Sequence, residues 1–188
     1  MPIRTDSTEK QIWLTLWKQL GEAITDSHHP FRFLVLGSSN GDLINQRYVV
    51  LRDMDDDLNL YVFSDNRTQK VNDLIKNSNC SALFYHQEER VQVRMNGKAE
   101  FLNSVDKEPY WNIIHGEAIK AYSSVKSPGT SIQDWGDAYE WDESIGFENF
   151  SVIRIIPQEI EMLQLNKLEH LRIRFSRSED WKGQKLVP

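Results

Sequence analysis

The sequence predicts a mainly β fold, in which an antiparallel sheet curls into a small barrel and helices flank it. Short runs rich in β-branched and aromatic residues begin at Phe31, and the connections between consecutive runs are too short for parallel crossovers. Asn40-Gly41 is a strong hairpin signal between the first two runs. The runs are FRFLVLGS, LINQRYVVLRDM, LNLYVFSD, CSALFYHQ, ERVQVRMNGKAEFL, FSVIRIIP, QEIEMLQL and EHLRIRFS, before a final turn and edge strand in SEDWKGQKLVP. We expect the central runs to form a meander.

An N-terminal helix is predicted at residues 7–21. Asp6 or Ser7 can cap it, and Gly21 offers a stop. An apolar stripe recurs at helical spacing, made of Ile12, Trp13, Leu16, Trp17 and Leu20. Such a stripe is normally used for core or dimer packing rather than for binding a ligand.

Two more helices interrupt the strands. Residues 68–79 form a short one, with Thr68 as N-cap and with Val71, Leu74 and Ile75 on one face. Residues 104–120 form the other, which begins with Ser104 as a capping residue. The following insert, residues 122–149, is polar but holds two Trp, which indicates an ordered excursion. We expect residues 1–188 to form a single domain.

Composition excludes several classes of function. The net charge of −6 argues against general binding to nucleic acid or to anionic membranes. No apolar run approaches the roughly 20 residues of a membrane helix, and the N-terminus lacks a signal sequence, so we expect a soluble cytoplasmic protein. The five histidines show no metal-binding spacing. Cys80, the only cysteine, lies in an apolar run and is expected to be buried.

The segment from Ser64 to Lys70 is the best candidate for an anion site. A strand ends there and a helix begins, so hydroxyls of Ser64 and Thr68, free backbone N–H groups and the cations of Arg67 and Lys70 can converge. Such a convergence favours phosphate. The alternative is an ordinary capped helix with solvent-exposed cations.

Two polar patterns on neighbouring strands extend this candidate site. Arg47 and Arg52 are five residues apart, so in a flat strand they point to opposite faces. A shared site then needs a bend, a ligand along the strand, or main-chain contacts from Val49 to Leu51. Gln92 lies on the polar face of an alternating strand, where its amide can read a planar heterocycle. The alternatives are solvated edge arginines and a solvated polar face.

With these residues in view, the chain resembles the pyridoxamine 5′-phosphate oxidase-like family of FMN-binding split β-barrel proteins. The blocks that carry the resemblance are RYVVLR, YVFSDNRTQK, NSNCSALFYH and ERVQVRMNGKAE. The resemblance implies an antiparallel split barrel and a homodimer with FMN at the interface. The cofactor-binding residues that it implies are Arg47, Tyr48, Val49, Val50, Leu51, Arg52, Phe63, Ser64, Gln69, Lys70, Gln92, Ser127 and Arg172.

Departures from the oxidase pattern concern the substrate. Arg52 stands where pyridoxamine oxidases carry lysine, and Gln69 where they carry arginine. Their substrate-phosphate tyrosine, arginine and serine align with Tyr110, Ile114 and Ala118, so two of three are lost. Leu168-Glu169-His170 replaces their C-terminal arginine-leucine-histidine, and Met162 replaces a tryptophan near the flavin. The insert resembles cyanobacterial and bacterial proteins outside the true oxidases.

The expected function is therefore that of an FMN-dependent oxidoreductase, an oxidase or reductase, acting on an unknown small molecule, and the lost phosphate ligands argue against a B6 vitamer as its substrate. The flavin would carry the electrons, and no catalytic side chain is assigned from the sequence. The alternative is a flavin-binding or flavin-storage protein without turnover, or a related barrel that binds haem or another flavin.

Overall fold

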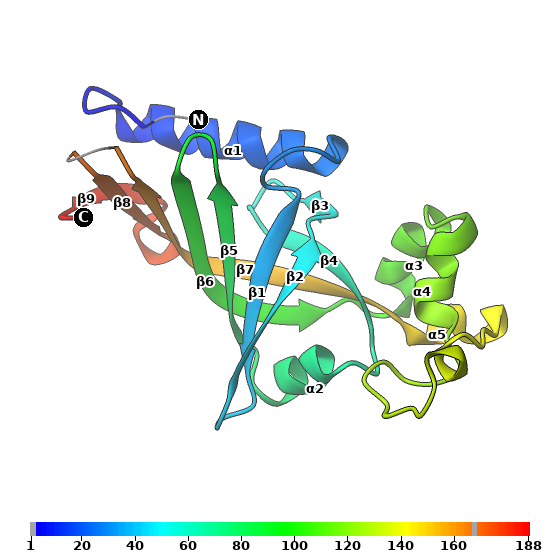
Figure 1. Ribbon diagram of the computed structural model, residues 1–188. Helices are drawn as coiled ribbons and strands as arrows, with labels where there is room; N and C mark the ends of the chain where they lie inside the picture. Colours follow the sequence, from blue (N-terminus) through cyan, green and yellow to red (C-terminus); the bar gives the residue numbers. More distant parts are fainter. Residues whose placement is uncertain (1–2, 167–168) are drawn as a thin grey trace.

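The computed structural model describes residues 3–166 and 169–188. Its centre is a curled antiparallel sheet (Figure 1). The strands in the described residues are β1 (Phe33–Ser39), β2 (Ile44–Val50), β3 (Asp53–Met54), β4 (Leu60–Asp65), β5 (Asn79–His86), β6 (Val91–Phe101), β7 (Phe150–Gln164), β8 (Leu171–Ser176) and β9 (Lys182–Leu186). The expected mainly β, antiparallel architecture with flanking helices is confirmed.

The strand order differs from the expected meander. The path runs β2-β1-β5-β6-β7-β4-β3, with β8 and β9 continuing from β7. Non-consecutive pairs such as β1 with β5 and β4 with β7 therefore hold the sheet together. The two ends of the path are consecutive in the chain, since β2 leads through Leu51 and Arg52 into β3, and the Arg52 N–H donates to the Tyr61 carbonyl of β4 at 2.9 Å. The sheet thus curls into a half-barrel.

Helix α1 (Glu9–Thr25) lies across one end of the sheet and seals the core (Figure 1). Ile12, Leu16 and Leu20 are buried, and they pack with inward-facing residues of the strands, such as Leu34 and Phe84. Alternation along each strand places these apolar side chains on the inner face. The predicted stripe therefore packs in the core, with Trp13 and Trp17 partly buried against it.

The bounds of α1 correct two expectations. Its N-cap is Thr8, which forms a capping box with Gln11, rather than Asp6 or Ser7. Gly21 does not end the helix, which continues to Thr25 because Ala23 extends the buried stripe by another turn.

Helix α2 (Gln69–Lys76) covers the opposite end of the sheet (Figure 1). Val71 and Leu74 are buried as expected, but Ile75 is 67% exposed. The buried polar residue of α2 is Asp73, whose carboxylate is held by hydrogen bonds described below. Thr68 occupies the N-cap position without a side-chain capping bond.

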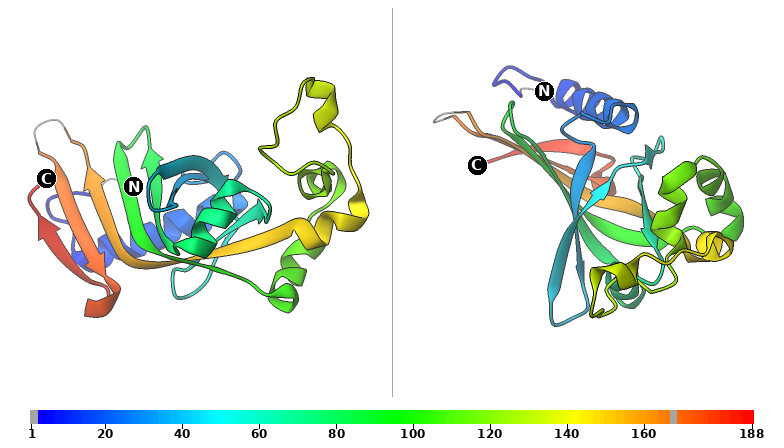
Figure 2. Two further views of the ribbon diagram at one scale, coloured as in Figure 1. Left: turned by 90° about the horizontal axis from the view of Figure 1, so that it is seen from below. Right: turned by 45° about the vertical axis from the view of Figure 1, so that its right-hand side comes forward.

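The remaining helices gather beyond the N-terminal end of β7, as the two views of Figure 2 show. They are α3 (Ser104–Asn112), α4 (Lys120–Ser123) and α5 (Gly146–Asn149), with 3₁₀ turns at Gly116–Ile119, Trp135–Ala138 and Glu143–Ile145. A further 3₁₀ turn, Arg177–Glu179, lies between β8 and β9. The single helix expected at residues 104–120 is broken before Gly116, whose φ is 59°, and its N-cap is Asn103 rather than Ser104. The insert is ordered, as expected, and its ends are joined by a bridge between Ser124 and Trp141.

Strand β7 is continuous where two strands were expected on either side of Pro157. Pro157 cannot donate to a ladder, but β7 carries an extra residue, Gln158, beside it, and the register with β6 shifts between Asn96 and Gly97. Gly97 allows a very close approach, since a Cβ built on it would lie 2.1 Å from the Ile156 carbonyl oxygen. The bulge thereby lets one long strand pass a proline.

Cys80 is buried, and burial raises the pKa of its thiol to about 12. It is a core-facing side chain, as expected. Within residues 3–166 and 169–188, no helix is long and apolar enough to cross a membrane.

The bulge opposite Gly97 gives a test of this fold. We expect Gly97→Ala to lower the free energy of unfolding by about 1–3 kcal/mol, because the added methyl group meets backbone that cannot move without breaking the ladder. Gly21→Ala is the matched control. Nothing lies within 4 Å of its added Cβ, so it should stabilise α1 by about 0.5–1 kcal/mol. Urea denaturation of both variants measures the difference, and equal stabilities would contradict the bulge.

Candidate functional site

The end of β4 and the start of α2 bring an amine and two hydroxyls together. The Lys70 ammonium donates to Ser64 Oγ at 3.0 Å and lies 3.5 Å from Thr68 Oγ1. The two hydroxyl oxygens are 3.1 Å apart. Ser64 is buried, and Lys70 is partly buried. Because Thr68 does not cap α2 with its side chain, the positive end of this helix adds to the same place.

Lys70 has a cationic neighbour rather than an anionic partner. Burial lowers the pKa of Lys70, the charge of Arg47 lowers it further, and Asp65 partly opposes both. In the described part of the chain, no carboxylate lies within ion-pair distance of the ammonium. The site therefore carries positive charge that the protein itself does not neutralise.

Arg47 is fixed beside this cluster by a buried carboxylate. Asp73 is fully buried and accepts from Ser38 at 3.2 Å, Asn45 at 3.0 Å and Gln69 at 2.7 Å. The Arg47 guanidinium donates to Ser38 Oγ at 2.8 Å and lies 4.0 Å from Asp73. Burial alone would raise the pKa of Asp73, but the hydrogen bonds and the charge of Arg47 lower it overall.

Asp73 was missed from the sequence because nothing local marks a polar residue on a helix as buried. The same network changes the role expected of Gln69, since its amide is bound to Asp73 rather than turned toward Lys70.

Arg67 does not join the cluster, contrary to expectation. Its guanidinium binds the Asp65 carboxylate at 2.7 Å and the Ser124 carbonyl at 2.8 Å. Arg67 therefore ties the loop before α2 to the insert, and Lys70 with Arg47 are the cations at the α2 start.

Arg52 lies at a different place from Arg47, which resolves their conflicting directions. Strand β2 ends at Val50, so Arg52 belongs to the following segment. Its guanidinium stacks over the Phe63 ring at 5.3 Å from the ring centre. Between the two arginines, Val49 and Leu51 are buried in the core, whereas Tyr48 is exposed.

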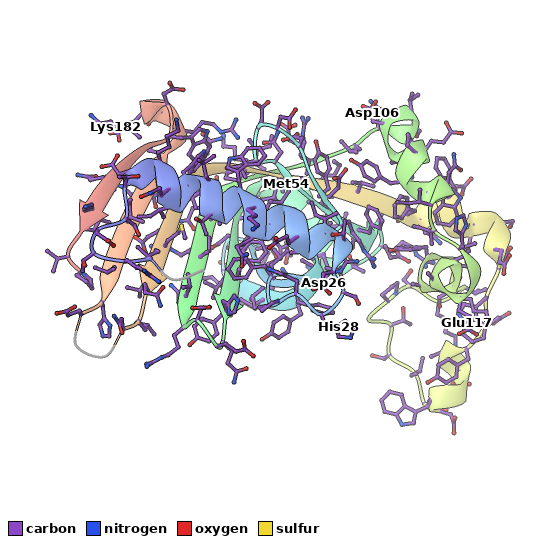
Figure 3. The ribbon with its side chains drawn as sticks, turned by 90° about the horizontal axis from the view of Figure 1, so that it is seen from above. Asp26, His28, Met54, Asp106, Glu117 and Lys182 are labelled. Atoms are coloured by element: carbon purple, nitrogen blue, oxygen red, sulfur yellow. The ribbon has the colours of Figure 1, made fainter. Side chains whose placement is uncertain are left out.

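A cavity of about 650 Å³ adjoins Arg52 and Phe63. It lies between the end of α1 and the segment from α3 to α4. In Figure 3, Asp26 marks the α1 side and Glu117 marks the α3–α4 side. Ile114 and Ala118 line it, as does Tyr122. Tyr110 is turned elsewhere, because its hydroxyl donates to Asp53 at 2.9 Å.

Gln92 and Arg172 lie on the outer face of the sheet. Both flank Leu163 in the register, Gln92 on β6 and Arg172 on β8, and the Arg172 guanidinium binds Glu161 at 2.8 Å. Met162 points into the core, so the neighbouring Leu163 carries the outer-face position. Ser127 lies in an exposed turn, where its carbonyl accepts from Thr130.

Within one chain the predicted residues thus form three groups, at α2, at the cavity and on the outer face. Ser127 stands apart from these groups, in the insert. Leu168, expected to replace an oxidase arginine, lies outside the described residues.

The α2 group fits a phosphate monoester by the chemistry of its donors. Lys70 and the start of α2 supply positive charge, and Ser64 and Thr68 supply hydroxyls. Arg47, which Asp73 holds in place, adds a second cation. Arg47 repels Lys70, and a bound anion would relieve this repulsion. An FMN phosphate therefore suits these residues.

Solved structures show the same fold at low sequence identity. A pyridoxamine 5′-phosphate oxidase-related, FMN-binding protein from Nostoc punctiforme is 18% identical, with a TM-score of 0.76 over 94% of this chain and 97% of its own. PhzG from Burkholderia lata, solved with tetrahydrophenazine-1-carboxylic acid, is 20% identical, with a TM-score of 0.76 over 98% and 95%. A general stress protein 26-related protein from Clostridium acetobutylicum is 15% identical, with a TM-score of 0.57 over 92% and 99%.

Residues 13–103 match the family model described as pyridoxamine 5′-phosphate oxidase, FMN-binding domain. No match was found among curated proteins. The matched region contains β1 to β6 and the whole α2 cluster, and the structural likeness extends the agreement to the remaining strands. Residues 13–103 therefore resemble the FMN-binding domain of the pyridoxamine 5′-phosphate oxidase family, and the chain shares the split β-barrel fold of these solved structures.

Proposed function

We propose that this protein binds FMN and acts as an FMN-dependent oxidoreductase on a small molecule. The observation that carries the proposal is the Lys70 ammonium, which is partly buried, bound only to hydroxyls among the described residues and repelled by Arg47. A charge in this position is stabilised when an anion joins it. The match to an FMN-binding family model supports the phosphate of FMN as that anion.

The phosphate would be held by side chains and backbone at the α2 start. Lys70 and Arg47 attract its charge, and the Ser64 and Thr68 hydroxyls, which here donate to the Asp65 carbonyl, would turn to donate to its oxygens. From there the cofactor would follow β2, whose main chain from Tyr48 to Leu51 leads from Arg47 to Arg52. The order of these residues along one strand matches a ligand with a charged end and a flat end.

We infer that a second copy of the chain supplies the contacts that one copy keeps apart. Gln92 and Arg172 lie on the outer face of the sheet, and this face exposes large aromatic side chains. Tyr48 is 76% exposed and Phe33 is 53% exposed. An exposed face that carries large aromatic side chains is suited to a symmetric contact with the same face of another protomer. Ser127 of the insert would approach the flavin at the same interface.

The bound flavin would accept or donate two electrons. The protein would hold its phosphate, bind its ring through Gln92 and the β2 main chain, and offer a cavity next to Arg52 for the reaction partner. This cavity favours an enzyme over a storage protein, because storage needs no second site beside the cofactor.

Lys70→Met tests the phosphate contact. It removes the ammonium but keeps most of the side-chain volume, and it leaves no buried carboxylate without a partner. We expect FMN affinity to fall at least about tenfold, because a charge-assisted hydrogen bond contributes about 1.5–3 kcal/mol. Flavin fluorescence quenching during titration measures the affinity.

Lys76→Met is the matched control on the same helix, since Lys76 is exposed in the last turn of α2. It should leave FMN affinity unchanged. A chain that purifies colourless and takes up no added FMN would refute the proposal, and equal affinities for the two variants would refute the phosphate assignment. Reduction of bound flavin by NADH or NADPH, followed by reoxidation, separates an enzyme from a carrier.

Tyr48→Glu tests the dimer. We expect a dimer in light scattering at micromolar concentration and a shift toward monomer in this variant, because the substitution places a charge at the centre of an apolar contact. Tyr139→Glu is the control, as Tyr139 is 62% exposed but lies in the insert. A monomeric parent protein, or an unchanged dimer in Tyr48→Glu, would contradict the interface.

A further inference from the structure

The cavity beside Arg52 is a second place where cations meet without an anion. Its polar lining residues are Arg32, Arg52, His115 and Tyr122, and none of its lining residues is acidic. Its volume of about 650 Å³ is that of a site for a small organic molecule. The positive charge of this cavity is separate from that of the α2 cluster, since the two lie at opposite ends of β2.

The two arginines of the cavity differ in how they are engaged. Arg32 donates to the carbonyls of Ala23 at 3.1 Å and Ile24 at 2.6 Å, and so closes the C-terminal end of α1. For Arg52, within the described residues, the guanidinium has no hydrogen-bond or ion-pair partner and rests on the Phe63 ring. Burial and repulsion by Arg52 both lower the pKa of Arg32. Arg52 is therefore the group with donors to spare.

Apolar side chains form the rest of the lining. Ile24 stands on one side, Ile114 and Ala118 stand on the other, and Phe63 lies beneath Arg52. Figure 3 shows the two sides from above, with Asp26 at the end of α1 and Glu117 next to Ala118 in the chain. These apolar side chains favour a flat apolar body and themselves offer it no hydrogen-bond donor.

One free guanidinium beside apolar walls determines which anionic group a ligand of this cavity carries. A guanidinium presents two parallel N–H donors that match one carboxylate. His115 and the Tyr122 hydroxyl can donate from the far wall, but a phosphate dianion carries more charge and a third oxygen, which would also meet Ile114 and Ala118. Burying such a group against these side chains would leave its oxygens unpaired.

We propose that this cavity binds a planar aromatic carboxylate, with the carboxylate on Arg52 and the ring between the apolar walls. Ile114 and Ala118 exclude phosphate monoesters from the same place. The proposal rests on the proposed function only in that this ligand is the reaction partner of the flavin. Binding itself depends on side chains of the cavity.

The test compares three probes of one shape, 2-naphthoate, 2-naphthyl phosphate and 2-naphthalenemethanol. Calorimetric titration of the full FMN-loaded chain should give 2-naphthoate an affinity at least about tenfold above those of the other two, the size expected for a charge-assisted pair. Arg52→Gln should abolish this preference, and Arg52→Lys should keep part of it. Arg90→Gln, an exposed arginine away from the cavity, should have no effect.

A gain of function complements this loss. Ile114→Arg adds a second guanidinium to the far wall, and we expect it to raise the affinity for 2-naphthyl phosphate relative to 2-naphthoate at least about tenfold. Thermal melting of each variant checks that it is folded, and loss of folding in one leaves the other as the test.

The outcomes separate this proposal from the previous one. Equal binding of 2-naphthoate and the neutral alcohol, or 2-naphthoate affinity unchanged in Arg52→Gln, would overturn it. Displacement of 2-naphthoate by FMN would also overturn it, because the cavity would then belong to the flavin. If the chain binds no FMN but still binds 2-naphthoate in an Arg52-dependent way, the cavity proposal stands and the flavin proposal fails.

Discussion

The buried carboxylate of Asp73 is the interaction on which the candidate site depends. It accepts from β1 through Ser38, from β2 through Asn45 and from its own helix through Gln69, so it fixes α2 against the β1–β2 hairpin. A buried carboxylate is tolerated only when it is paired and hydrogen-bonded, and Arg47 provides the charge. Because Asp73 engages Arg47 but not Lys70, the cluster keeps one cation for a ligand.

Much of the sheet could be predicted because its signals are local. Alternation of apolar and polar residues marks each strand, and a hairpin turn needs only a residue such as Gly41 at a positive φ of 105°. The order of the strands could not be predicted, since pairs such as β1 with β5 depend on how the whole sheet curls. Pro157 misled the strand assignment for the same reason, as the bulge beside it, with Gln158 as the extra residue, depends on pairing with Gly97 of another strand.

The predicted site residues divide in the same way, into those marked by local signals and those that depend on distant strands. Ser64 lies near the end of a strand, and Lys70 lies in the first turn of the helix that follows. Because the two are close in sequence, the structure brings them together. Ile75 was assigned to the buried face of α2 by its apolar character, yet the neighbouring Asp73 is buried instead. A propensity for burial is a property of a side chain alone, whereas the burial of Asp73 depends on partners from two distant strands. Gln92 and Arg172 are likewise neighbours only through the register of β7.

Strand β2 connects the two cationic places and constrains both. Paired with β1 along its whole length, from Ile44 to Val50, it sets the separation between Arg47 and the segment that carries Arg52. The far wall of the cavity comes from the α3–α4 segment, which lies outside the sheet and packs beyond β7. Substitutions such as those at Ile114 and Ala118 therefore change what the cavity accepts without moving the α2 cluster. A fold arranged in this way can keep one cofactor site while its substrate site diverges, because the residues that define each site stand on elements with separate packing.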